Sequence, residues 1–114
     1  MNPQEIFNQL DRCTLALSKG NIEQKRLGIE KAKAEREYRI KYNQKMLKLK
    51  LEKCPSTLIQ ALTKNDPEVV ELAMKRDIAE SAYYTAISAS ENIRLEIEVL
   101  RSKLTWLRVE FKNS

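Results

Sequence analysis

The sequence predicts an all-α fold, a long antiparallel helical hairpin that is coiled-coil-like and has a short helical segment at its turn. Three observations predict it. The chain of 114 residues has only 2 Gly and 3 Pro, so few turns are available to connect strands. Apolar residues recur at spacings of three and four along two long stretches. Two of the three prolines lie in one short segment between those stretches, from Cys54 to Glu68.

The first arm is expected to begin at Pro3, since proline suits the first helical position. One apolar stripe follows, formed by Ile6, Leu10, Cys13 and Leu17. Gly20 is the weak point of this arm. It could end a first helix with Asn21 capping the next one, or the helix could continue with a slight bend. We assign helices over about residues 3–19 and 21–53 and leave the break at Gly20 open.

The turn segment is predicted from its proline and its short polar residues. Pro55 ends the long helix, because the residue before a proline is pushed out of the α region. Ser56 or Thr57 is then expected to cap a short helix over about residues 56–63.

The final helix has the clearest start signal in the chain. Asp66 is a good N-cap residue and Pro67 suits the first position, so a helix is expected over about residues 67–112. Eleven of thirteen heptad positions on it are apolar or Tyr. These positions are Val69, Leu72, Arg76, Ala79, Tyr83, Ala86, Ser90, Ile93, Ile97, Leu100, Leu104, Leu107 and Phe111. A period sustained this long indicates a coiled-coil seam.

The two arms are expected to pair as neighbours in a single domain, residues 1–114. Short connections make consecutive helices antiparallel, and the two arms have similar lengths. A turn set about Gln60 places Leu10 opposite Phe111 and Cys13 opposite Leu107.

A second apolar stripe on each arm predicts self-association. A two-helix hairpin buries only one face of each helix, so these stripes need cover from the N-terminal segment or from another subunit. We expect a homo-oligomer that forms a helical bundle, with a two-fold dimer first because that closure is commonest. The stripe residues are Leu95, Val99, Trp106 and Val109 on the last helix, and Ile40, Leu47 and Leu51 on the first arm.

The positive charge lies mainly in the first arm. The net charge is +5, and residues 19–53 carry 12 basic and 5 acidic groups. This surface could contact nucleic-acid phosphates, with stacking from nearby tyrosines. It could equally be a solvated helix face or a surface for an acidic protein partner. The candidate nucleic-acid contacts are Arg39, Lys41, Lys45, Lys48 and Lys50.

The composition argues against catalysis. The chain has no His, so the usual general base, the serine and cysteine dyads and most zinc sites are missing. Cys13 and Cys54 are far apart in the sequence and fit a reducing compartment. We therefore expect no enzyme activity, no catalytic residue, no metal and no cofactor. No signal peptide or membrane span is visible, so a cytoplasmic protein without membrane association is expected.

Four segments resemble small helical proteins encoded by bacterial phages and prophages. They read AEREYR at residues 34–39, LKL at 47–49, PSTLI at 55–59 and EVVELAMKRDIAE at 68–80. The resemblance covers roughly residues 30–108. It implies a phage or prophage accessory protein, encoded near replication and recombination genes, and implies no catalytic residue.

Residues and resemblance together predict a non-enzymatic, oligomeric coiled-coil module. Its expected partners are phage or host replication and recombination proteins, in the cytoplasm of the host cell. The alternative is a helical protein that binds nucleic acid through the basic face of residues 39–53.

Overall fold

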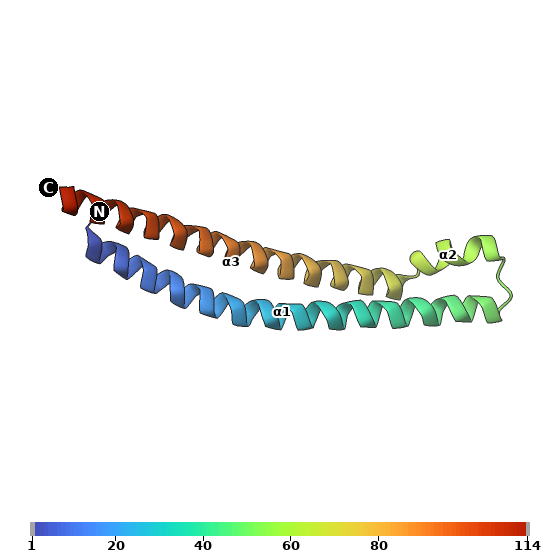
Figure 1. Cartoon of the computed structure of the whole chain (residues 1–114). Helices are drawn as coiled ribbons and strands as arrows, with labels where there is room; N and C mark the ends of the chain where they lie inside the picture. The colour runs from blue at the N-terminus through green and yellow to red at the C-terminus, as the bar shows by residue number, and fades with distance from the viewer. Residues whose placement is uncertain (1, 114) are drawn as a thin grey trace. The chain divides into compact units, whose positions relative to one another are not determined.

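A computed structural model describes residues 2–113, which form three α-helices (Figure 1). They are α1 (Pro3–Leu51), α2 (Ser56–Lys64) and α3 (Pro67–Asn113). The all-α helical hairpin is therefore confirmed: α3 returns antiparallel to α1 after the short α2.

The described chain divides into two compact units. The terminal unit comprises the chain up to Lys25 together with the chain from Tyr84 on, and the central unit is Arg26–Tyr83. Each unit contains part of α1 and an antiparallel part of α3. The expectation of one domain stays a prediction.

Helix α1 begins where the sequence predicts but does not break. The Asn2 side-chain oxygen accepts a hydrogen bond from the backbone N–H of Glu5 at 2.9 Å, and Pro3 is the first helical residue. Of the two alternatives left open at Gly20, the continuous helix is the one found: α1 runs through Gly20, and the division into helices over 3–19 and 21–53 is not present. A glycine inside a helix costs only about 1 kcal/mol relative to alanine. Here the missing side chain lets α1 approach Ser90 of α3 closely.

The chain reverses through a Schellman motif at the end of α1. The N–H of Cys54 donates to the carbonyl of Leu49 at 3.0 Å, and that of Lys53 donates to Lys50 at 3.1 Å. Lys53 has φ of 60°, the left-handed conformation that glycine usually supplies at this position. The motif ends the helix at Leu51, two residues before the predicted end.

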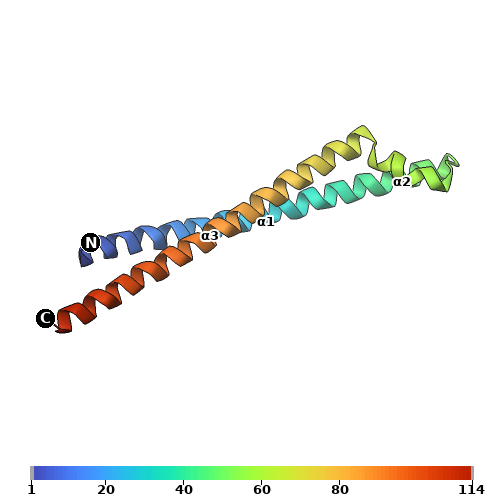
Figure 2. The ribbon, with the colours of Figure 1, turned by 90° about the horizontal axis from the view of Figure 1, so that it is seen from above.

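Helix α2 packs along the last turns of α1 within the central unit (Figures 1 and 2). Its buried residues are Ile59 and Thr63, and the Thr63 hydroxyl donates to the carbonyl of Ile59 at 2.7 Å. The N-cap is Pro55, and no side chain caps the helix, so the predicted cap by Ser56 or Thr57 is wrong.

Helix α3 starts and packs as the sequence predicts. The Asp66 carboxylate accepts the backbone N–H groups of Glu68 at 3.0 Å and Val69 at 3.2 Å. The predicted seam is buried or half-buried from Val69 to Leu107, whereas Phe111 is exposed. In the terminal unit, α1 and α3 share a cluster built on Ile6, Cys13, Leu100 and their apolar neighbours Leu10, Ile93, Ile97, Leu104 and Leu107.

The central unit has aromatic and charged contacts in addition to its buried aliphatic residues Leu49, Ile59 and Val69. The Arg76 guanidinium lies 4.1 Å from the centre of the Tyr38 ring, a cation–π contact between α3 and α1. Tyr38 also contacts Tyr42, with ring centres 5.8 Å apart. A Cβ atom at Gly28 would lie 3.2 Å from the Tyr83 ring, so the glycine makes room for that side chain.

The arms pair about three helical turns away from the predicted register. A turn at Gln60 would place Leu100 opposite Gly20, but Ser90 lies there instead. In the central unit Lys45 pairs with Asp66 rather than with a residue further along α3.

The cause is the position of α2. The chain reverses direction between α1 and α2, and α2 already packs along α1 as the first part of the returning arm. The reversal therefore lies before Gln60, the residue about which the sequence predicts the turn. The predicted pairs of Leu10 with Phe111 and Cys13 with Leu107 are therefore wrong: Cys13 clusters with Leu100.

Candidate binding surfaces

A stripe of exposed apolar side chains follows α3 in the terminal unit. Leu95 is 58% exposed, Val99 54%, Trp106 63% and Val109 51%. They lie on the opposite side of the helix from Leu100, which is 2% exposed in the seam with α1. We call these four residues the α3 stripe. The sequence predicts all four as a surface for a partner or a second subunit, and the fold leaves all four open to solvent.

The surface around Trp106 is hollowed. One shallow depression runs between Leu95, Val99 and Trp106, with Lys103 at its side. A second hollow of about 220 Å³ lies beside Trp106, where Ile6 of α1 approaches. The indole therefore stands between two apolar depressions, which is the surface shape that accepts side chains from a partner helix.

A second stripe lies on α1 in the central unit. Ile40 is 46% exposed, Leu47 58% and Leu51 76%. We call these three residues the α1 stripe. Lys48 and Lys50 flank it on opposite sides, each about 80° around the helix, and Lys33 and Arg36 precede it on the same face. A partner for this stripe would therefore need acidic flanks.

The five candidate nucleic-acid contacts do not share one face. Lys41, Lys45 and Lys48 lie within about 60° of one another around α1. Arg39 and Lys50 lie on the other side of the α1 stripe. The basic residues therefore form two rows separated by apolar side chains.

Acidic neighbours engage three of the five. Lys41 pairs with Glu68, Lys45 with Asp66 at 3.2 Å, and Arg39 with Glu35 at 3.0 Å. The hydrogen bond from Lys41 to Glu68, together with the charge of that carboxylate, raises the pKa of the lysine above its usual value.

Asp66 is both the cap of α3 and the partner of Lys45. Partial burial raises the pKa of its carboxyl, but the hydrogen bond from Lys45 and the backbone N–H groups of Val69 and Glu68 outweigh burial and lower that pKa overall. Together with Glu68 and Lys41, these residues tie the start of α3 to α1.

The thiols and carboxylates do not assemble into a metal site in the part of the chain that the structure describes. Cys13 and Cys54 are both free thiols; Cys13 is buried and Cys54 is half-buried. Burial raises the pKa of the Cys13 thiol, and the nearby Glu96 carboxylate, with which it shares a hydrogen bond, raises it further. This thiol is held in its protonated form, the opposite of an activated nucleophile.

None of the described helices contains a stretch that is long and apolar enough to cross a membrane.

Sequence reasoning missed other exposed apolar residues. On α3 in the central unit, Val70, Met74 and Ile78 are each at least half exposed. Their spacing of four, one position away from the seam at Val69, was a readable signal. Further exposed apolar side chains are Phe7, Leu15 and Ile22 in the terminal unit, and Ile29, Leu58 and Leu62 in the central unit.

The fold and these surfaces define a class: an all-α helical hairpin with apolar stripes on the outer sides of its long helices. Comparison with family models, with curated proteins and with solved structures gives no match for this chain. The resemblance to phage and prophage proteins therefore stays a prediction from the sequence.

Proposed function

We propose that this chain is a non-enzymatic, oligomeric binding module that holds amphipathic helices of other proteins. The observation that carries the proposal is the exposure of apolar residues at helical spacing along both long helices. Contiguous exposed apolar surface on a small protein marks an interaction site more often than a free surface. The setting we propose, from the sequence resemblance, is a phage or prophage accessory protein that acts on replication or recombination proteins.

The partner is assigned to the α1 stripe by charge. Ile40, Leu47 and Leu51 supply an apolar line, and the basic residues beside them favour an approaching helix with Asp and Glu on its flanks. Helix-in-groove recognition reads such anchors at spacings of three, four and seven.

Binding of nucleic acid stays the second candidate. The basic excess of the first arm supports it. The ion pairs of Lys41 with Glu68 and of Lys45 with Asp66 weigh against it, because paired lysines contact phosphates only after breaking those pairs.

Affinity capture with a matched pair of variants tests the proposal. The tagged full chain is used to capture proteins from a bacterial lysate, with and without nuclease treatment. The test variant combines Ile40→Ser with Leu47→Ser, and the control combines Leu15→Ser with Ile22→Ser, which removes apolar residues at least as exposed elsewhere on α1. We expect the native chain and the control to retain a protein that the test variant loses.

Two results would contradict the proposal. The first is capture of the same proteins by the test variant and the native chain. The second is capture that disappears on nuclease treatment, together with a gel shift that weakens with salt and with the changes Lys48→Glu and Lys50→Glu. That second result would establish the nucleic-acid function instead.

A further inference from the structure

The outer side of α3 in the terminal unit carries a second complete heptad pattern. Leu95, Val99, Ser102, Trp106 and Val109 follow one another at spacings of four, three, four and three. All five side chains are exposed, whereas the seam toward α1 on the other side of the same helix is buried or half-buried. Alternating spacings of three and four are the pattern of a coiled-coil seam, and this face carries that pattern without a helix of the same chain packed on it.

The charged residues beside this seam change sign along the helix. Glu91, Glu96 and Glu98 flank its first half, and Lys103 and Lys112 flank its second half together with one acid, Glu110. All six are exposed, and Glu96 also shares a hydrogen bond with Cys13 of α1. A helix with acidic flanks at one end of a seam and basic flanks at the other is complementary to a copy of itself that runs in the opposite direction.

We infer that the partner on this face is the α3 helix of a second copy of the chain, packed antiparallel about a two-fold axis. This deepens the oligomeric part of the proposed function and rests on it. Leu95 then packs against Trp106 of the second copy, and Val99 against its Ser102. The two-fold axis repeats each contact, which is the self-complementarity that a symmetric dimer needs.

The flanking residues select this register. In an antiparallel pair with these layers, Glu96 faces Lys103 of the second copy and Glu91 faces its Lys112. Symmetry doubles both, so four opposite-charge pairs form. The remaining acid in the basic half, Glu110, falls opposite the neutral Ala89. No like-charge pair arises among these flanking positions.

A parallel arrangement is poorer on the same count. It would place Glu91 beside Glu96 of the second copy, which gives two like-charge pairs by symmetry. The only opposite-charge pair that it would form is Glu98 with Lys103, also twice. Attraction and repulsion would then cancel. The charge pattern therefore favours the antiparallel direction over the parallel one.

Charge-reversal variants test this interface on the purified full chain. Sedimentation equilibrium should give a dimer for the native protein, with the dissociation constant raised at least tenfold by Glu96→Lys and by Lys103→Glu. The variant with both changes should regain native affinity, because each pair is only inverted. An equimolar mixture of the two single variants should form a heterodimer.

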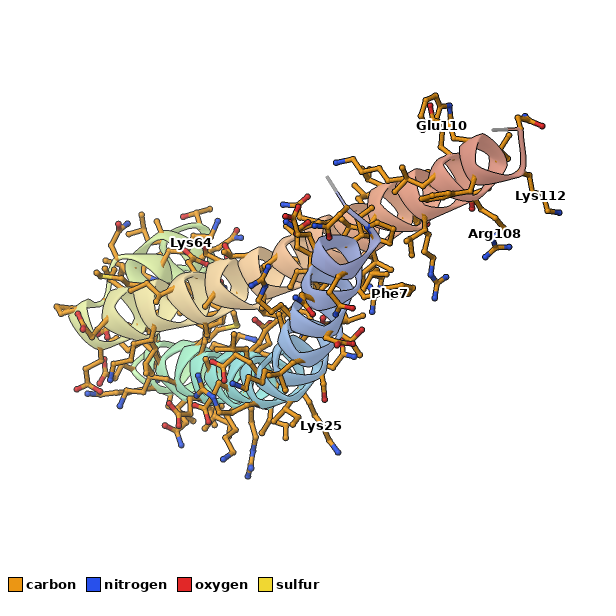
Figure 3. The ribbon with its side chains drawn as sticks, turned by 90° about the vertical axis from the view of Figure 1, so that its left-hand side faces the viewer. Phe7, Lys25, Lys64, Arg108, Glu110 and Lys112 are labelled. Atoms are coloured by element: carbon orange, nitrogen blue, oxygen red, sulfur yellow. The ribbon has the colours of Figure 1, made fainter. Side chains whose placement is uncertain are left out.

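The matched control is Arg101→Glu, which makes the same charge change as Lys103→Glu at an exposed position of α3 away from this seam. Figure 3 shows the corresponding geometry one heptad later, where Arg108 and Glu110 project from opposite sides of α3. Arg101→Glu should leave the dissociation constant within twofold of native. Circular dichroism at low concentration confirms that each variant is helical. Glu96→Lys also removes the hydrogen bond between Glu96 and Cys13. The double variant lacks that bond as well, so its recovery shows that the weaker dimer of the single variant comes from the interface charges.

Three results would overturn the inference. They are a native chain that is monomeric at tens of micromolar, a dimer that none of the reversals weakens, and a dimer that Glu96→Lys tightens, as a parallel pair would. None of these depends on the capture experiment with the α1 stripe. Failure of self-association on α3 and failure of partner binding on α1 are therefore separate observations.

Discussion

A Cβ atom at Gly20 would lie 3.2 Å from the hydroxyl oxygen of Ser90, where α1 and α3 approach closely in the terminal unit. Ser90 is 1% exposed, and its hydroxyl has no hydrogen-bond partner among the described residues. The small size of both residues, rather than any polar contact, is what this position provides.

Replacing Ser90 with Ala should raise the free energy of unfolding by about 1 kcal/mol, because a buried hydroxyl without a partner loses its hydration. Gly20→Ala gains helix propensity, about 1 kcal/mol, but crowds the serine. We expect it to stabilise more in the Ser90→Ala background than alone. A double-mutant cycle by urea unfolding measures the difference; strictly additive changes would argue against the contact.

Lys53→Gly should stabilise the hairpin by about 1 kcal/mol, because glycine adopts the positive φ of this position without a steric penalty. Glu52→Gly is the control, since its backbone has no positive φ and glycine there adds only chain entropy. Thermal unfolding of both variants distinguishes the effects. Equal destabilisation by the two would show that Lys53 carries no strain.

Asp66 makes the stability of the protein depend on pH in the acid range. Its pKa in the folded chain lies below the usual 3.8, so its contribution is fully present above 3.8 and is lost as the pH falls through the lower, folded value. Asp66→Asn keeps an N-cap acceptor but removes the charge facing Lys45.

The thermal midpoint of Asp66→Asn should therefore fall by a few degrees at pH 7 and converge with that of the native protein in strong acid. Asp66→Ala, which also lacks the cap, should stay below both at every pH. A difference in thermal midpoint between Asp66→Asn and the native protein that does not narrow in acid would contradict a stabilising ion pair between Asp66 and Lys45.

Cys13 should react slowly with thiol reagents and Cys54 quickly, because Cys13 is buried and its pKa is raised above the usual 9.0. Two kinetic phases of equal amplitude are expected, and Cys13→Ala should remove the slow one.

The raised pKa of Cys13 also makes stability depend on pH in the alkaline range. The contribution of the buried thiol is fully present below pH 9.0 and is lost as the pH rises through the higher pKa of the folded chain. Cys13→Ala should lack that alkaline decline.

The sequence was most informative where one physical signal acts alone. The seam of α3 from Val69 to Leu107 follows from its heptad, the start of α1 follows from Pro3, and the cap of α3 follows from Asp66, whose side chain accepts backbone hydrogen bonds. The apolar stripes could be predicted for the same reason. Once one face of a helix is assigned to the seam, apolar residues on the opposite face must be exposed.

The register was not readable, because it depends on where α2 packs. A short helix between two long ones can form the turn itself or the first part of the returning arm. Its helix propensity is the same in both arrangements, so the sequence does not distinguish them. The same limit applies to Gly20 and Gly28, whose roles depend on which residues of α3 lie across from them. Local pattern determines elements and faces, whereas pairing between distant segments requires the tertiary structure.

The length of α3 constrains how this sequence can change over time. The helix runs for 47 residues without interruption from one cap at Asp66. Inserting or deleting a single residue near its start would rotate every later position by about 100°, turning the seam and the outer stripe to new directions at once. Descendants of this sequence should therefore differ in length at the reversal near Lys53 or at the chain ends, and elsewhere only by steps close to whole heptads.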